Sequence, residues 1–199
     1  MRRANAAENL RGPKDSTMSD AQPASVYDLA HEEEVESLAT FAVLVDNEPG
    51  VLHRLVGLFA ARGYNIDSLT VAETDQNAHT SRVTIVTRGT PHVLAQIEAQ
   101  LTKMVSTRHV QDVTRDPNGL ERELALIKVK GSGPDRVEAL RVADIFRAKV
   151  IDITHQSFVF ELTGASSKID KFTELMRPLG LVEVSRTGVL SIQRGVEVL

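Results

Sequence analysis

The 199-residue sequence contains no cysteine, and only 4% of its residues are aromatic. The lack of cysteine excludes disulfides, thiolate nucleophiles and zinc sites built on cysteine, and it is consistent with a reducing compartment. The scarcity of aromatic residues argues against a sheet that stacks RNA bases, because such sheets carry aromatic side chains on their central strands.

An excess of positive charge and long apolar runs are also missing. The formal net charge is −4 at pH 7, so the chain has no basic surface for a phosphate backbone and we expect no nucleic-acid partner. No run approaches the roughly 18 apolar residues that a membrane span requires. The first thirty residues contain no apolar stretch that resembles a signal peptide. We therefore expect a cytoplasmic protein that does not contact a membrane.

The overall composition is that of a folded protein, with 42% apolar and 25% charged residues. The length allows one medium domain or two small ones. Residues 1–38 differ from the rest, because they are polar and show no sustained period of 2 or 3.6. We predict that they form a disordered extension, to which we assign no function. Within it, Met18 could be the true start, or Glu32 to Glu34 could begin a short helix.

From Thr40 onwards the pattern predicts the element order βαββαβ. A continuous apolar run starting at Thr40 predicts a buried strand. A turn at Asn47 to Gly50 follows, and Pro49 suits the start of a helix that Gly63 then ends. We predict further strands over 66–72, 81–88 and 107–114, and a second helix over 91–105.

A second unit with the same order follows the turn signal at Asp116 to Gly119. We predict strands over 123–130, 150–154, 158–163 and 181–191, and helices over 135–147 and 166–177. The two units give an α+β protein with two ferredoxin-like domains, over 39–115 and 119–199. Each domain is expected to have a four-stranded antiparallel sheet with two helices on one face. The other face carries apolar and threonine positions, so we expect sheets or sheet edges to pair between subunits.

The segment from Asp46 to Leu52 has the features of a carboxylate-binding loop. A strand ends there and a helix begins, so free backbone N–H groups and a partial positive charge meet at one point. Gly50 lets a ligand approach the backbone closely, and Asn47 can offer its amide to a ligand or cap the helix. The alternative interpretation is an ordinary turn between a strand and a helix.

The segment from Arg62 to Ile66 also has two interpretations. In one, Gly63 caps the helix and Asn65 is a turn residue. In the other, Asn65 faces the same cleft or subunit interface as the first loop, and Ile66 supplies an apolar wall. The spacing of these residues does not decide between them.

No pattern of catalytic residues is present. The six histidines lie on different predicted elements, and none has a partner at the spacing of a metal site. There is no Gly-x-Ser-x-Gly motif, and Gly131 to Pro134 lacks the Lys-Ser/Thr ending of a phosphate-binding loop. We therefore expect no metal site and no catalytic activity on this chain alone.

Motifs in both units resemble one known family. In the first unit they are Asn47 to Leu52, Arg62 to Ile66 and Ser68 to Val71, and in the second Glu121 to Leu124 and Glu183 to Gly188. Together they resemble the small regulatory subunit of acetolactate synthase (acetohydroxyacid synthase), whose first domain is an ACT domain. The resemblance covers about residues 40–199, and only the N-terminal extension departs from it.

The resemblance implies a regulatory role in branched-chain amino acid biosynthesis. Members of the family bind a large catalytic subunit, raise its activity and confer feedback inhibition by valine, or in some members by leucine or isoleucine. The large subunit holds thiamine diphosphate, magnesium and FAD, so we expect no cofactor on this chain. In the family the effector lies where two ACT domains pair in a homodimer. The matching positions here are Asn47, Gly50, Val51, Leu52, Asn65 and Ile66.

In this interpretation, helix N–H groups would hold the effector's carboxylate, and asparagine and backbone oxygens would hold its ammonium. Val51, Leu52 and Ile66 would contact the branched side chain. An alternative function is a free-standing tandem-ACT sensor that controls another enzyme or a transcription factor. The second-unit motifs at Glu121 to Leu124 and at Gly188 favour the small-subunit family, because a generic tandem-ACT protein has no reason to carry them.

Overall fold

The computed structural model describes residues 35–75 and 79–196. Residues 1–34, on which most of the predicted disordered extension falls, lie outside the described part, as do 76–78 in the predicted turn at 74–79. The predicted first strand begins three residues earlier than expected, at Ser37 instead of Thr40. Two βαββαβ units are present as predicted, and a short additional strand follows them.

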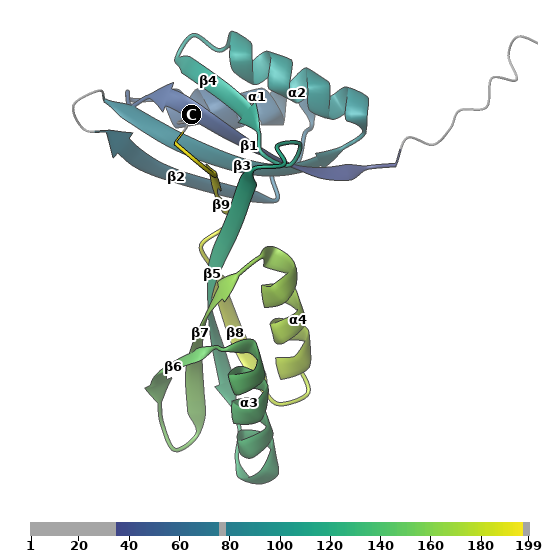
Figure 1. The fold of residues 1–199 in the computed structure, drawn as a ribbon, viewed down its shortest axis with the longest axis vertical. Helices are drawn as coiled ribbons and strands as arrows, with labels where there is room; N and C mark the ends of the chain where they lie inside the picture. Colours follow the sequence, from purple (N-terminus) through teal and green to yellow (C-terminus); the bar gives the residue numbers. More distant parts are fainter. Residues whose placement is uncertain (1–34, 76–78, 197–199) are drawn as a thin grey trace, which may run out of the picture. The chain divides into compact units, whose positions relative to one another are not determined.

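The first unit forms a four-stranded antiparallel sheet covered by two helices (Figure 1). The strand order is β2-β3-β1-β4, which is the ferredoxin-like arrangement. The elements are β1 (Ser37–Asp46), α1 (Val51–Arg62), β2 (Ser68–Asp75), β3 (Thr80–Gly89), α2 (Pro91–Lys103) and β4 (Thr107–Asp112). Helix α2 ends two residues before the predicted position, at Lys103.

The core of the first unit follows from the period-2 pattern of β1. Every second residue of this strand points toward the helices, so Phe41 and Val43 are fully buried. From the helices, Leu55 and Phe59 of α1 and the buried face of α2 complete the same cluster. Gly63 ends α1 in the left-handed conformation, with φ of 68°, as the sequence predicts.

The second unit repeats this plan with strand order β6-β7-β5-β8 (Figure 1). Its elements are β5 (Gly119–Lys130), α3 (Gly133–Phe146), β6 (Lys149–Ile153), β7 (Ser157–Gly164), α4 (Ser166–Met176) and β8 (Leu181–Arg186). Its core combines aliphatic side chains with the rings of Phe158, Phe160 and Phe172, and the last two pack edge-on with centroids 5.9 Å apart.

The prediction of a single strand over 181–191 is wrong, because the structure has two strands there. The chain turns at Gly188, where φ is 82°, and this turn separates β8 from β9 (Leu190–Gln193). Strand β9 pairs with the first four residues of β5, from Gly119 to Arg122, while the later part of β5 pairs with β7 and β8. Strand β5 is therefore longer than predicted, because its first part has its own partner.

The helix-free face of the first sheet is largely buried. Ala42, Thr84 and Val86 on this face are each less than 5% exposed. Part of the cover is the turn after β8, because the backbone N–H of Val189 donates a hydrogen bond to Ser68 on β2, 3.1 Å away. In the described part of the chain, no helix is long and apolar enough to span a bilayer.

Candidate functional site

The loop between β1 and α1 leaves the N-terminus of the helix open. Gly50 is the N-cap, with φ of 85°, and a Cβ at this position would meet no atom within 4 Å. The glycine is therefore required by the left-handed backbone and not by crowding. Among the described residues, the backbone N–H groups of Leu52 and His53 have no backbone acceptor, as expected for the first turn of a helix.

Asn47 does not cap this helix. No side chain caps α1, and the Asn47 amide instead donates to the Glu73 carboxylate at the end of β2, 3.3 Å away. The backbone N–H of Asn47 donates to the His79 carbonyl across 2.7 Å. The capping role that the sequence allowed for Asn47 is therefore wrong, because the loop places its side chain beside β2.

The negative charge in the first loop is already paired. The Glu48 carboxylate accepts a hydrogen bond from Ser106 across 2.5 Å and another from Arg54, and Ser106 in turn accepts from Arg54. The Ser106 hydrogen bond, followed by that of Arg54, holds the pKa of Glu48 below its usual value. Asp46 pairs with Arg108 across 2.6 Å. The positive end of α1 therefore faces no free carboxylate of this loop and can accept one from a ligand.

The two apolar residues of the first loop have different surroundings. Val51 is 8% exposed and belongs to the core, whereas Leu52 is 40% exposed. The side chain of Val51 therefore offers little surface for the contact with a branched side chain that the resemblance implied. Leu52 offers more, and Val56, one turn further along the helix, is 38% exposed.

The second loop is fixed by hydrogen bonds from neighbouring residues. The backbone carbonyl of Asn65 accepts from the buried Thr87 hydroxyl across 2.6 Å. The Asn65 amide donates to Asp67 across 2.6 Å, and Asp67 also accepts from Arg88 across 2.9 Å. Ile66 packs against the core with part of its surface. Asn65 itself is exposed.

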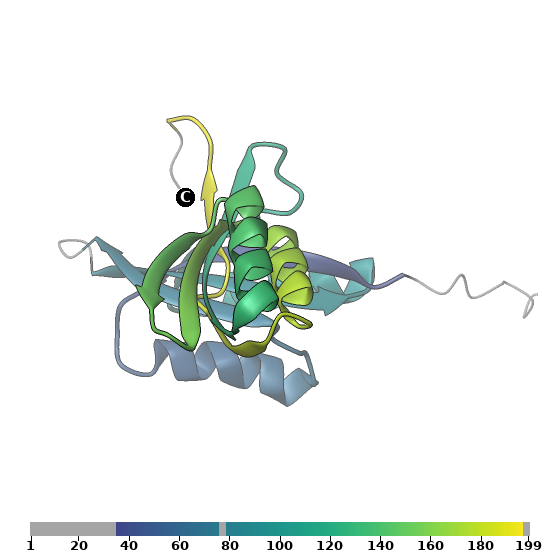
Figure 2. The ribbon, with the colours of Figure 1, turned by 90° about the horizontal axis from the view of Figure 1, so that it is seen from below.

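The six predicted site residues are not brought together within one chain. Helix α1 has 12 residues, and at 1.5 Å per residue its two ends are about 18 Å apart. The first loop lies at one end of α1 and the second loop at the other (Figure 2). A shared cleft within one chain, one of the two possibilities that the sequence left open for Asn65, is therefore wrong.

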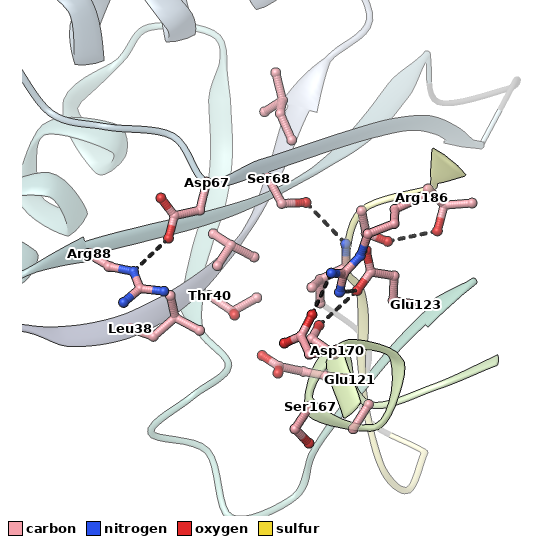
Figure 3. Close-up of a pocket in the computed structure, with 17 residues that line it drawn as sticks. Leu38, Thr40, Asp67, Ser68, Arg88, Glu121, Glu123, Ser167, Asp170 and Arg186 are labelled. Carbon is pink, nitrogen blue, oxygen red and sulfur yellow. Dashed lines mark hydrogen bonds and ion pairs between the residues drawn. The ribbon is translucent and has the colours of Figure 1, made fainter. Parts of the chain in front are cut away.

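A cavity of about 720 Å³ next to the second loop was not predicted from the sequence. Asp67 and Arg88 lie on one side of it, and Arg186, Glu123 and Asp170 on the other (Figure 3). These charged groups pair with each other. Glu123 and Arg186 are separated by 63 positions, and no local pattern could indicate that they meet.

Arg186 uses both ends of its guanidinium group in this cavity. Its Nε and Nη2 donate to the two oxygens of Glu123 across 2.7 and 2.5 Å, and its Nη1 donates to Asp170 across 2.6 Å. The hydrogen bonds that Arg186 donates to Glu123, and then the one that it donates to Asp170, raise the pKa of Arg186 above its usual value. Because these donors are occupied, Arg186 acts as a structural link between β8, β5 and α4.

Within residues 35–75 and 79–196 there is no group of three or more metal-ligating side chains. The polar groups at the two loops are amides, backbone N–H groups and carboxylates already paired with arginine. Amides, backbone N–H groups and carboxylates are the kinds of group that can hold the ammonium and carboxylate of a small zwitterion.

Comparisons with known proteins cover both units. Residues 41–109 match the family described as the AHAS small subunit-like ACT domain, and residues 122–195 match the family described as the small subunit of acetolactate synthase. The probable acetolactate synthase small subunit of Archaeoglobus fulgidus is 44% identical over 156 residues, which are 78% of this chain and 96% of that protein. The isozyme 3 small subunit of Escherichia coli is 43% identical over 159 residues, or 79% and 96% of the two chains.

A solved structure agrees with these sequence relatives. The crystal structure of the acetolactate synthase small subunit from Thermotoga maritima aligns with a TM-score of 0.71 and 36% sequence identity. The alignment covers 81% of this chain and 99% of that one. The similarity is high in sequence and in structure, and it extends through both domains. The chain belongs to the family of acetolactate synthase small subunits.

Proposed function

We propose that this chain is a regulatory subunit that binds the large catalytic subunit of acetolactate synthase, raises its activity and confers feedback inhibition by valine or another branched-chain amino acid. The observation that carries the proposal is the open N-terminus of α1 in an ACT domain, where Gly50 leaves free space above the first turn. A helix N-terminus of this kind favours a carboxylate. The names of the relatives support the association with a large subunit.

The effector site is formed between two copies of the ACT domain. The two loops are about 18 Å apart on one chain, and a free amino acid is far too short to bridge them. In a homodimer, the first loop of one protomer can face the second loop of its partner. The exposed apolar side chains of Leu52 and Val56 on α1, and of Val71 on the edge strand β2, offer surface for such pairing.

Each part of the effector has a matching group in this arrangement. The N–H groups of Leu52 and His53 hold the carboxylate at the positive end of α1. Asn65 from the partner holds the ammonium, and Leu52 with Ile66 contacts the branched side chain. Because the ligand touches both protomers, it favours one packing of the two ACT domains. A difference in affinity between two packings is sufficient for allosteric control.

The chemical reaction takes place on the large subunit. There, thiamine diphosphate, magnesium and FAD would be bound, and two pyruvates, or pyruvate and 2-oxobutyrate, would be joined with loss of carbon dioxide. This chain would hold none of these cofactors and would act in the cytoplasm as part of the complex. Its own contribution is the coupling between effector binding and the state of the catalytic subunit.

The second candidate is a free-standing tandem-ACT sensor. The extent of the similarity weighs against it, because the matches to small subunits continue through residues 122–195 and include the second domain. The test is to assay acetolactate synthase activity of the cognate large subunit with and without this chain. The assay is then repeated with increasing valine, leucine and isoleucine. Stimulation that an amino acid reverses supports the regulatory subunit, whereas no complex and no stimulation would support the free-standing sensor.

A further inference from the structure

The Asn65 amide is held in one orientation by Asp67. An ionised carboxylate can only accept hydrogen bonds, so the Asn65 group that faces Asp67, 2.6 Å away, must be its NH₂. The orientation of the amide therefore follows from the chemistry of its neighbour. The Asn65 Oδ1 atom is left pointing away from Asp67, and no donor reaches it from the described residues.

Asp67 is itself held in place from two directions. Arg88 on β3 donates from Nε to the other carboxylate oxygen across 2.9 Å. The backbone N–H of Asp67 donates to the Val86 carbonyl across 2.8 Å, at the start of the β2–β3 ladder. The backbone of Asn65 is fixed as well, by the hydroxyl of Thr87, which is fully buried. The amide oxygen of Asn65 is thus presented from a rigid support.

An outward amide oxygen distinguishes the two ends of an amino acid. An ammonium group has only donors, and a carboxylate has only acceptors. Asn65 Oδ1 can therefore bind the ammonium and cannot bind the carboxylate. It also discriminates against 2-oxo acids, which have no donor at this position. It discriminates more weakly against 2-hydroxy acids, whose uncharged hydroxyl can either donate or accept a hydrogen bond.

We infer that Asp67, supported by Arg88, is a positioning residue that turns the Asn65 amide oxygen toward the effector's ammonium and so selects 2-amino acids over their 2-hydroxy and 2-oxo analogues. This inference rests on the proposed function, because it assumes that Asn65 faces the effector. It goes further in that it fixes the polarity of binding, with the ammonium at the second loop and the carboxylate at α1. It also assigns selectivity to a residue outside the loop motifs.

The experiment compares two classes of ligand and three variants of the full-length chain. Calorimetry measures the binding of L-valine, L-leucine and L-isoleucine and of their 2-hydroxy analogues to the wild type, to Asp67→Asn, to Arg88→Gln and to Asp152→Asn. An asparagine at position 67 can donate a hydrogen bond to Asn65 Oδ1 and so allows the side-chain amide of Asn65 to flip. Asp152, an exposed aspartate on β6 of the second sheet, provides the matched control.

We expect Asp67→Asn to weaken binding of the amino acid by about tenfold or more, the loss typical of a hydrogen bond to a charged group. Binding of the 2-hydroxy analogue should change much less. Arg88→Gln should cause a smaller loss in the same direction, because Asp67 remains, and Asp152→Asn should match the wild type.

Three outcomes would count against the inference. Equal losses for both ligands would make Asp67 a purely structural residue. If the wild type binds the amino acid and Asp67→Asn binds it equally well, the inference is overturned and the proposed function remains intact. A wild type that binds no branched-chain amino acid would overturn the proposed function as well.

Discussion

The Val189 backbone and the Ser68 hydroxyl form a hydrogen bond across 121 positions of sequence, with the N–H donating over 3.1 Å. A second contact reinforces it, since the Thr70 hydroxyl donates to the Thr187 carbonyl across 3.3 Å. Ser68 and Thr70 belong to β2, whose preceding residues form the second loop of the proposed effector site. The turn between β8 and β9 therefore lies directly against the strand that leaves this loop.

Gly188 makes this close approach possible, and Gly188→Ala should disturb it. A Cβ at this position would lie 2.5 Å from the Ser68 hydroxyl oxygen, and φ is 82°. The left-handed backbone alone costs an alanine at least about 1 kcal/mol, and the clash adds to this. We expect a lower free energy of unfolding, measured in urea. Gly57→Ala, at a helical position with no atom within 4 Å, should retain or slightly raise it. Equal stability of the two variants would contradict this role for Gly188.

The pair of Glu123 and Arg186 should contribute strongly to the stability of the second domain. The Glu123 side chain is 5% exposed, so Arg186→Met leaves a buried carboxylate with the Ser166 hydroxyl as its remaining donor. We expect the free energy of unfolding to fall by about 3 kcal/mol. This is the lower end of the range for breaking a buried ion pair, because Arg186 is itself one-third exposed. In Lys128→Met the lost pair with Glu183 is exposed, and the free energy of unfolding should fall much less. Similar losses in both variants would argue against this difference.

Ser106→Ala should raise the pKa of Glu48 toward its usual value, because the Ser106 hydrogen bond is the largest cause of the lowering. A carboxyl whose pKa is lowered by folding stabilises the protein above its unfolded pKa. That contribution is lost as the pH falls through the folded pKa. The variant should therefore lose less stability on acidification. NMR titration of the Glu48 carboxyl carbon measures the shift, and Glu174, whose pKa is lowered by Lys171, should titrate as before.

Gly50→Asp should abolish feedback inhibition but leave activation of the large subunit unchanged. The aspartate places bulk and like charge where the effector's carboxylate would bind. We expect the effector concentration for half-inhibition to rise at least about tenfold. Gly133→Asp is the matched control, because Gly133 begins α3 of the second domain and is also left-handed, at φ of 57°, with no atom within 4 Å. Unchanged inhibition in Gly50→Asp would refute the placement of the carboxylate.

A site shared by two protomers should show complementation between variants. Neither Gly50→Asp nor Asn65→Ala should respond to the effector when it is the only form present. In a mixed dimer, one of the two sites carries both changes and the other carries neither. Co-refolding the two variants should therefore restore part of the inhibition, measured in the activity assay. No recovery in a mixture proven to contain mixed dimers would place both residues in one protomer's site.

Much of the fold could be predicted from local patterns. The apolar run of β1 identified a buried strand, and Gly63 and Pro91 marked helix ends that the structure places within one or two residues. These signals are reliable because each depends only on residues close in sequence. Gly63 and Pro91 act through their backbone conformations, and the strand is indicated by its own run of apolar residues. The prediction of one strand over 181–191 was wrong because the local signal there was too weak. Gly188 is a weak local signal, and only contact with β2 shows that a turn is required there.

The sequence by itself determined the two βαββαβ units, the open helix N-terminus at Gly50 and the loop residues that resemble an effector site. Only the tertiary structure decided that the Asn47 amide meets Glu73, that Val51 points into the core, and that Glu123 meets Arg186. A sequence pattern reports which face of an element is apolar. It cannot report which distant element covers that face, because the neighbour is fixed by strand order and packing.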